Sequence, residues 1–356
     1  MPRRRPFRLQ TERLTLRMLA RDDITDFTRY RNRPEVARYQ EWSLPYTRDL
    51  AHELVDEMDA MGQPEPGAWA QLAMDRDGRL VGDFAVWIDP ADELAMIGYT
   101  VAPEHQGHAY AVEAAEAVIE WLFARGTIHR VAATIDPRNM ASARVLERCG
   151  FEYVGTARSA AWSRGEWTDD ARFSLLAEDW RTWRSRPTHP PRSVRFVPVD
   201  ATNVDAVCAL DIAHSQRRFV RTISESIARA AHPPLVDGEP VEPWYRAIEA
   251  DGELVGFVML AHQPGRAPRL WQLLVDRRHP RRGIATRAVG AVARHVAAGG
   301  SRWLDASFVD EPGGPEVFYD RLGFQRSGEA EPGGDMTCRA ATADVIRLVE
   351  LLIDRP

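Results

Sequence analysis

The sequence repeats itself at an interval of about 174 residues, and this repeat limits the fold more than any other feature. Residues 76–82 (RDGRLVG) return as residues 250–256 (ADGELVG). Further landmarks recur in the same order: Val101, Ala109 and Ala111 return as Val275, Gly283 and Ala285, and Gly150-Phe151 returns as Gly323-Phe324, one position early. The interval is too long for a solenoid unit, so it indicates two copies of one whole domain.

Composition restricts the class of protein further. The 356 residues have room for two cores, and 44% hydrophobic with 28% charged residues is ordinary for a globular protein. No apolar run approaches the roughly 18 residues of a membrane span, and the basic start at residues 1–6 precedes no apolar stretch. We therefore expect a cytoplasmic protein with no secretory signal and no membrane partner.

Cysteine spacing and net charge exclude other classes. The cysteines, Cys149, Cys208 and Cys338, are far apart and form no CxxC pair, so we expect neither a disulfide framework nor a metal site. The net charge of −6 argues against a nucleic-acid partner.

The order of apolar patterns predicts an α+β fold in each copy, with a central, mostly antiparallel sheet flanked by helices. We expect a first domain at 1–183, a polar, proline-rich linker at 184–193 and a second domain at 194–356. The first domain is predicted to hold strands at 9–17, 69–74, 79–88, 95–101, 130–135 and 173–176, and helices after Asp23 and at 48–61, 112–123 and 141–149.

The second domain is predicted to hold strands at 194–199, 271–275 and 303–308, a hairpin at 245–260, and helices at 284–298 and 316–322. A final amphipathic segment, 343–353, has no counterpart in the first copy, and we expect it to pack across the two copies.

The sharpest local signal is the segment 101–111, which leads from a predicted strand directly into a predicted helix. Small residues at Gly107, Ala109 and Ala111 let a ligand approach the backbone, and the helix start offers free N–H groups and a positive dipole end. The pattern predicts an anion site that a pyrophosphate would fit, although an ordinary strand–turn–helix connection has the same pattern.

This loop and its neighbours resemble the GNAT superfamily of coenzyme A-dependent N-acyltransferases, whose acceptor loop has the pattern Gln/Arg-x-x-Gly-x-Gly/Ala. The resemblance covers nearly the whole chain as two domains, the linker excepted. In the first copy, residues 9–17, 31–40 and 97–101 look like the branch that acetylates ribosomal-protein N-termini, and 136–142 with Gly150-Phe151 match its second motif. The resemblance implies that Asn139 contacts the pantetheine arm and that Ser142 protonates the leaving thiolate. Without it, Asn139 is a helix cap and Ser142 a solvent-facing residue.

The second copy resembles a different branch, the small-molecule polyamine acetyltransferases. Residues 216–220, 253–260 and 318–324 carry this likeness. It implies that Tyr319 is the general acid, since its hydroxyl can donate a proton to the thiolate. A core aromatic is the alternative interpretation of Tyr319.

Both copies depart from their branches. Met96 stands where the first branch commonly has a proton-accepting Glu. In the second loop Pro280 lacks an N–H, and Arg281 replaces the glycine of the first loop. Arg281 and Arg282 can still bind phosphate through charge-assisted hydrogen bonds. The sequence indicates no clear general base: Glu104, Asp276 and Asp305 are weak candidates, and His105 and His108 are expected to be solvated loop residues.

We therefore expect an N-acyltransferase that moves an acyl group from acetyl-CoA or another acyl-CoA to an amine. The acceptor is a small molecule, a natural product or a peptide N-terminus. The residues expected to bind the donor are Val101, Gln106, Gly107, His108, Ala109, Tyr110, Ala111 and Asn139 in the first copy, and Val275, Arg281, Arg282, Gly283, Ile284 and Ala285 in the second. Two alternatives stay open: a donor carried by an acyl carrier protein, and a non-catalytic acyl-CoA sensor or scaffold.

Overall fold

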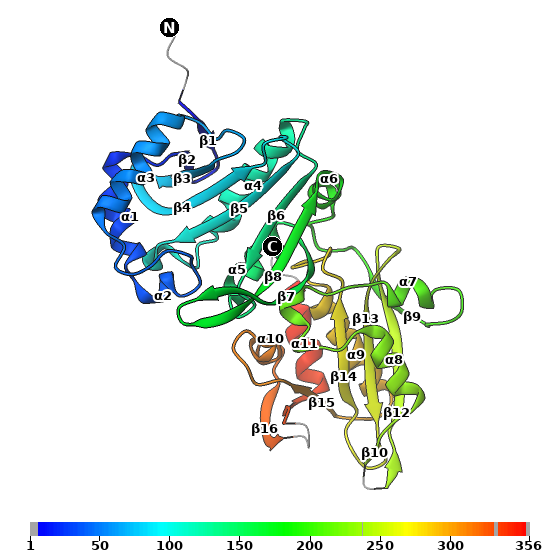
Figure 1. The fold of residues 1–356 in the computed structure, drawn as a ribbon. Coiled ribbons are helices and arrows are strands. Elements are labelled where there is room, and N and C mark those ends of the chain that lie inside the picture. Colours follow the sequence, from blue (N-terminus) through cyan, green and yellow to red (C-terminus); the bar gives the residue numbers. More distant parts are fainter. Residues whose placement is uncertain (1–5, 237, 331–333, 354–356) are drawn as a thin grey trace. The chain divides into compact units, whose positions relative to one another are not determined.

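The computed structural model describes residues 6–236, 238–330 and 334–353, and the chain divides into two compact units between Ser185 and Arg186 (Figure 1). The basic start on which the expectation about a secretory signal rests lies almost wholly in residues 1–5, outside the described residues. Each unit is a sheet with helices on both faces, and each is described by itself.

Within the described residues, the N-terminal unit has an eight-stranded sheet in the order β1-β2-β3-β4-β5-β6-β8-β7. Its neighbouring strands are antiparallel except β5 and β6, which are parallel. The strands are β1 Arg8–Gln10, β2 Thr15–Met18, β3 Trp69–Arg76, β4 Arg79–Ile88, β5 Leu94–Val101, β6 Arg130–Ile135, β7 Glu152–Ser163 and β8 Glu166–Leu176. The predicted single strand 9–17 is in fact the hairpin β1–β2, because Thr11 N–H bonds Leu14 O and turns the chain.

Helices cover both faces of this sheet. The helices are α1 Ile24–Arg31, α2 Pro34–Ala37, α3 Arg48–Met61, α4 Tyr110–Ala124, α5 Met140–Arg148 and α6 Ala177–Ser185, with 3-10 turns η1 Arg21–Asp23 and η2 Pro103–His105. Buried residues of α4, α5 and α6 form one core with the sheet, and those of α1 and α3 form another. The apolar side of α3 was evident in the sequence, and its bounds match the predicted 48–61.

The C-terminal unit repeats this topology. Within the described residues, its main sheet has seven strands in the order β16-β17-β15-β14-β13-β12-β9, and β14–β15 is its parallel pair. The strands of the main sheet are β9 Val194–Val197, β12 Glu242–Ala250, β13 Glu253–His262, β14 Arg269–Val275, β15 Trp303–Phe308, β16 Gln325–Ala330 and β17 Met336–Ala341. Strands β10 Leu235–Val236 and β11 Glu239–Pro240 form a separate two-stranded sheet. The helices are α7 Val204–Cys208, η3 His214–Gln216, α8 Ile223–Ala231, α9 Ile284–Ala298, α10 Glu316–Arg321 and α11 Thr342–Ile353.

The second glycine of each repeated segment, Gly82 or Gly256, lies where a side chain does not fit. A Cβ at Gly82 would lie 2.3 Å from Thr100 O, and one at Gly256 would lie 2.3 Å from Leu274 O. Both contacts are far inside van der Waals distance, so β4 and β13 can approach the next strand closely only with glycine at these positions. The repeat therefore records a packing requirement that the two sheets share.

The last helix, α11, has a counterpart in the N-terminal unit. Gly150 and Gly323 both have a positive φ, and a Cβ there would lie within 3 Å of Trp183 on α6 and of Leu348 on α11, respectively. Helix α11 thus occupies in its unit the place that α6 occupies in the first. It also packs within its own unit against α9, where Gly290 faces Val349. The expectation that 343–353 has no counterpart is wrong, because α6 is too short and polar to be recognised from its pattern.

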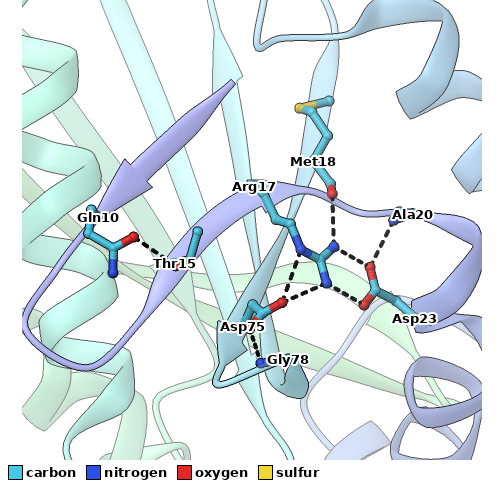
Figure 2. A network of polar contacts seen from close by, with 8 residues as sticks. All are labelled: Gln10, Thr15, Arg17, Met18, Ala20, Asp23, Asp75 and Gly78. Carbon is cyan, nitrogen blue, oxygen red and sulfur yellow. Dashed lines mark hydrogen bonds and ion pairs between the residues drawn. The ribbon is translucent and has the colours of Figure 1, made fainter. Parts of the chain in front are cut away.

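A half-buried ion-pair network connects the start of α1 to the sheet (Figure 2). The Arg17 guanidinium on β2 donates two hydrogen bonds to Asp23, of 2.6 and 2.8 Å, and further bonds to Asp75. Asp23 also accepts the Ala20 N–H, and Asp75 accepts the Gly78 N–H in the β3–β4 turn. One arginine thereby joins a helix start, a strand and a turn.

Two further properties concern the whole described chain. No helix in the described ranges has both the length and the hydropathy to cross a membrane. In the same ranges, no group of three or more His, Cys, Asp or Glu side chains is placed to hold a metal ion.

Candidate active site

The parallel strands of the N-terminal sheet separate along their length. Strand β5 pairs with β6 only through Leu94, Ala95 and Met96, and the rest of the two strands is not hydrogen-bonded together. A cavity of about 520 Å³ lies at this opening, lined by residues 97–101 of β5 and 133–135 of β6. Its volume is that of a typical small-molecule site.

The loop after β5 forms one wall of this cavity. Gly107 and Ala109 both adopt left-handed backbone conformations, with φ of 79° and 63°, and α4 begins at Tyr110. A left-handed alanine is strained, and such strain often marks a functional loop. The Gln106 amide holds the loop through a 3.1 Å hydrogen bond to Val101 O.

The loop also presents N–H donors. The N–H groups of Val112 and Glu113 are taken by Ala109 O, whereas the first N–H groups of a helix have no acceptor within it. A Cβ placed on Gly107 would meet no protein atom within 4 Å, so the space above this glycine is open. Free donors, open space and the positive helix end together suit a phosphate group.

Most of the residues that the sequence predicts to bind the donor or to protonate the thiolate in the first copy line this one cavity. The lining residues from that set are Val101, Gln106, Gly107, Ala109, Tyr110, Ala111, Asn139 and Ser142. His108 is not among them; its ring stacks on that of Tyr110, with the centroids 5.5 Å apart. Two arginines that the sequence did not single out, Arg144 and Arg148, also line the cavity one helical turn apart on α5.

The start of α5 positions a pair of hydroxyl groups. The Asn139 side chain caps the helix by accepting the Ser142 N–H at 3.2 Å. The Ser142 hydroxyl lies 2.9 Å from the Tyr99 hydroxyl, which also donates to Ser142 O at 3.0 Å. Burial raises the pKa of Tyr99 well above its ordinary value, while the Ser142 contact lowers it in part. Tyr99 belongs to the 97–101 motif, but its contact with Ser142 is not evident from the sequence, because its position in a strand resembles that of a core aromatic.

One carboxylate belongs to the cavity. Among the described lining residues only Glu35, in α2, is acidic, and it forms an exposed ion pair with Arg33. Its own backbone N–H and Arg33 hold its pKa below the ordinary value. Glu104 instead pairs with Arg29 outside the cavity wall, and Met96 lies in the paired part of β5. Glu35 is therefore suited to hold a cation and, since its pKa is low, poorly suited to accept a proton.

The C-terminal unit has an opening of the same kind. Strands β14 and β15 pair only through Arg269 and Leu270, and a cavity of about 400 Å³ lies beyond this point. Tyr319 lines it, 7% exposed, with its ring against Phe308, Phe318 and Phe324. Burial raises the pKa of Tyr319, so the phenol keeps its proton at neutral pH.

The second loop keeps the backbone of the first despite Pro280. Arg281 and Gly283 are left-handed, with φ of 58° and 72°, and α9 starts at Ile284 as α4 starts at Tyr110. The surroundings differ. Of the residues predicted to bind the donor in the second copy, only Val275 and Ala285 line the cavity. The others, Arg281, Arg282, Gly283 and Ile284, do not.

Arg282 is directed into its own unit. It is 4% exposed, its Nε donates to His189 O at 2.9 Å, and its Nη1 lies 2.8 Å from His279 Nδ1. These contacts hold the linker segment and leave the guanidinium turned away from solvent. The candidate bases are engaged as well: Asp276 is buried and accepts from Arg278, and Asp305 forms a two-bonded pair with Arg339.

Comparison with known proteins supplies an independent result for each half. The family model described as "Acetyltransferase (GNAT) domain" matches residues 13–152, and "Acetyltransferase (GNAT) family" matches residues 210–324. An uncharacterized N-acetyltransferase, p20, of Bacillus licheniformis is 28% identical over 178 residues, covering 48% of this chain and 97% of that protein. The [ribosomal protein uS5]-alanine N-acetyltransferase of Escherichia coli is 30% identical over 104 residues, 29% of this chain and 54% of that protein. A solved Bacillus anthracis acetyltransferase of the GNAT family is 24% identical, with a TM-score of 0.42, and covers 48% of this chain and 99% of that one.

Proposed function

The chain belongs to the GNAT acetyltransferase family, with one such domain in each half, and from this premise we propose that the N-terminal domain transfers an acetyl group from acetyl-CoA to a primary amine. One observation carries the proposal. A single cavity is lined by the loop before α4, which includes Gly107 and Ala109 and is called the phosphate-type loop below. The same cavity is lined by Asn139, the Ser142–Tyr99 hydroxyl pair and the carboxylate of Glu35.

The loop and α5 are suited to hold the donor. Its pyrophosphate would be bound by the free N–H groups of the loop and the dipole of α4, with Arg144 and Arg148 as further cations. Asn139, at the opening between β5 and β6, would contact the pantetheine arm. The donor supplies the activated thioester carbonyl that the amine attacks.

The hydroxyl pair is suited to deliver a proton. As the C–N bond forms and the C–S bond breaks, the nitrogen gives up one proton to solvent and the departing sulfur takes up one. Ser142 Oγ can donate the proton to sulfur, Tyr99, 2.9 Å away, can replace it, and a proton from solvent then restores the pair. Since burial raises the pKa of Tyr99, this phenol stays protonated wherever the amine is reactive.

Glu35 is suited to hold the acceptor. A low-pKa carboxylate attracts the ammonium group of the acceptor and holds it in the cavity. The fraction of the amine that has lost its proton to solvent then attacks the thioester, so that positioning supplies much of the rate. The acceptor is then a small amine or a peptide N-terminus. The peptide case is favoured by the E. coli relative, whose name gives a ribosomal-protein alanine as its acceptor.

The test is an acetyl-transfer assay with the full chain, small primary amines and short peptides as acceptors, and two donors, acetyl-CoA and an acetyl-loaded carrier protein. We expect transfer from acetyl-CoA, and a roughly tenfold higher KM for the amine in Glu35→Gln with the donor KM unchanged. Glu53→Gln on α3 removes the same charge from an exposed position and should leave both constants alone. Transfer from the carrier protein alone, or acetyl-CoA binding with no transfer to any amine, would contradict the proposal.

A further inference from the structure

The cavity wall that carries Glu35 has little regular structure of its own. Glu35, Val36, Tyr39 and Gln40 line the cavity of the N-terminal unit. Helix α2 has only four residues, and the chain from 38 to 47 is irregular until α3 begins. The position of this wall therefore depends on contacts with other elements.

One set of contacts holds the far end of the irregular segment to α1. The Asn32 side chain donates to Tyr46 O at 2.7 Å and accepts the Tyr46 N–H at 2.9 Å. The Trp42 indole N–H donates to Arg31 O at 3.1 Å. These bonds act on residues 42–46, beyond the part that lines the cavity.

Arg164, at the tip of the β7–β8 hairpin, contacts the part that these bonds leave out. Its Nη2 donates to Ala37 O at 2.7 Å and to Trp42 O at 3.0 Å, 127 and 122 positions earlier in the chain. Ala37 ends α2, and its carbonyl also accepts the Gln40 N–H at 3.0 Å. One guanidinium thus joins both ends of the turn between Ala37 and Trp42, which contains two residues of the cavity wall.

The hairpin turn itself does not favour an arginine. Ser163 pairs with Glu166, so Arg164 and Gly165 form a two-residue turn, and both have positive φ, of 52° and 85°. A type I′ turn of this kind favours Asn or Gly at its first position, and other side chains are strained there. The contacts of the Arg164 guanidinium, and not the conformation of its backbone, account for an arginine at this position.

The hairpin tip is a firm support for these contacts. Trp162 and Trp167 form a cross-strand pair next to the turn, with ring centroids 5.5 Å apart, and such pairs stabilise a hairpin. Glu166 accepts a 2.8 Å hydrogen bond from Arg138, which directly precedes the helix cap Asn139. The tip is therefore connected both to the start of α5 and to the wall that carries Glu35.

We infer that Arg164 is a positioning residue for the acceptor amine. It holds the wall formed by residues 35–40, and thereby the Glu35 carboxylate, in the place where that carboxylate binds the amine. The inference rests on the function proposed above for the N-terminal domain. Arg164 is not among the described residues that line the cavity, so it acts through the turn that it holds.

The first experiment measures steady-state kinetics of acetyl transfer by the full chain. Arg164→Asn keeps a residue that the turn favours and removes the guanidinium. We expect the KM for the amine to rise about fivefold, with kcat and the KM for acetyl-CoA within about twofold of the wild type. Arg164→Lys should restore the KM, because one ammonium group can donate to both carbonyls as the single Nη2 does. Arg158→Asn removes an exposed arginine of the same hairpin and is the matched control.

A double variant tests whether Arg164 acts through Glu35. When Glu35 is already replaced by Gln, adding Arg164→Asn should change the amine KM by less than about twofold. A further fivefold rise would overturn the inference, since Arg164 would then act independently of Glu35. An amine KM that rises in Glu35→Gln but stays at the wild-type value in Arg164→Asn would also overturn it and leave the proposed function intact.

Hydrogen–deuterium exchange of the full chain tests the same contacts without catalysis. The backbone N–H groups of residues 38–42 should exchange about fivefold faster in Arg164→Asn than in the wild type, and at the wild-type rate in Arg158→Asn. Unchanged exchange in Arg164→Asn overturns the inference, whether or not the chain transfers acetyl groups. Faster exchange in a chain that acetylates no amine would contradict the proposed function and still confirm that Arg164 holds this wall.

Discussion

The two strand-to-helix loops have the same backbone and different surroundings. Both have left-handed residues at equivalent positions, Gly107 and Ala109 in one, Arg281 and Gly283 in the other. The first loop forms a cavity wall, whereas the second contributes only Ala285 from its helix start and uses Arg282 to fasten the linker. The two copies thus share the backbone of the turn, while the contacts that the turn makes differ.

The same contrast extends to the side chains that line the cavities. The first unit offers Glu35 beside a phosphate-type loop, which suits a cationic acceptor and an anionic donor. The second offers an aromatic opening around Tyr319. Equivalent folds therefore present different side chains to a ligand, and the catalytic assignment depends on the cavities more than on the fold.

The largest expected effect tests whether the first loop binds the donor. Gly107→Asp places a carboxylate among the free N–H groups, where it competes with and repels a phosphate. Losing two charge-assisted hydrogen bonds predicts a fall in kcat/KM for acetyl-CoA on the order of 1,000-fold. Steady-state kinetics with varied donor measure it.

The matched control is Gly78→Asp. Gly78 has φ of 78°, close to the 79° of Gly107, and equally open space around a Cβ, but it lies in the β3–β4 turn. It carries the same backbone strain without the phosphate site, and activity should remain. A similar loss in both variants would show that strain, and not donor binding, explains the effect.

The next effect tests the hydroxyl pair. Tyr99→Phe and Ser142→Ala should each lower kcat about 100-fold, the contribution of a general acid, with the KM for acetyl-CoA nearly constant. The double variant should be little worse than either single one, since the two hydroxyls act as a unit. Tyr153→Phe, which removes an exposed hydroxyl bonded to Thr156, is the control. Additive losses would contradict a shared proton path.

The pH dependence of kcat/KM tests the same hydroxyl pair. An acid must be protonated to act, and a raised pKa means that Tyr99 keeps its proton to higher pH than a free tyrosine. We expect kcat/KM to rise as the amine deprotonates and not to fall again below about pH 10. A decline between pH 7 and 9 in the wild type would point to a different acid.

The buried position of Arg282 predicts an effect of its substitution on stability alone. Arg282→Gln removes bonds to His189 O and His279 from a buried position, which should destabilise the C-terminal unit by about 1.5–3 kcal/mol. Denaturant unfolding of the variant measures this cost, and acetyl transfer should be unchanged. A loss of donor binding in this variant would assign the phosphate site to the second loop.

The smallest expected effect concerns Tyr319. If the reaction belongs to the first unit, Tyr319→Phe changes turnover by less than about twofold, whatever this residue does in its own cavity. Its assignment as an acid by family resemblance stays a prediction. A 100-fold loss of turnover would move the reaction to the C-terminal domain.

Sequence patterns predicted the elements that local chemistry determines. The apolar periodicity of α3 and α9 and the short apolar strands β6 and β15 matched their bounds, since each buries one face against a core. Strand β7 was not foreseen. Its residues alternate between exposed and half-buried, so no apolar face identifies it in the sequence.

The site was predictable where it depends on backbone conformation and less so where it depends on tertiary contacts. Gly107 and Ala109 were identified because small residues before a helix permit a left-handed turn. Tyr99 was missed because only the separation of β5 from β6 gives it access to a cavity. Arg282 was expected to bind phosphate because nothing local shows that His189, 93 positions earlier, returns to accept its hydrogen bond.

The central claim is that donor binding belongs to the first loop, and native mass spectrometry with acetyl-CoA tests it most directly. We predict one acetyl-CoA per chain, absent in Gly107→Asp and retained in Arg281→Asp, which places the same carboxylate on the equivalent left-handed position of the second loop. Two molecules per chain, or a single molecule lost only in Arg281→Asp, would contradict the claim.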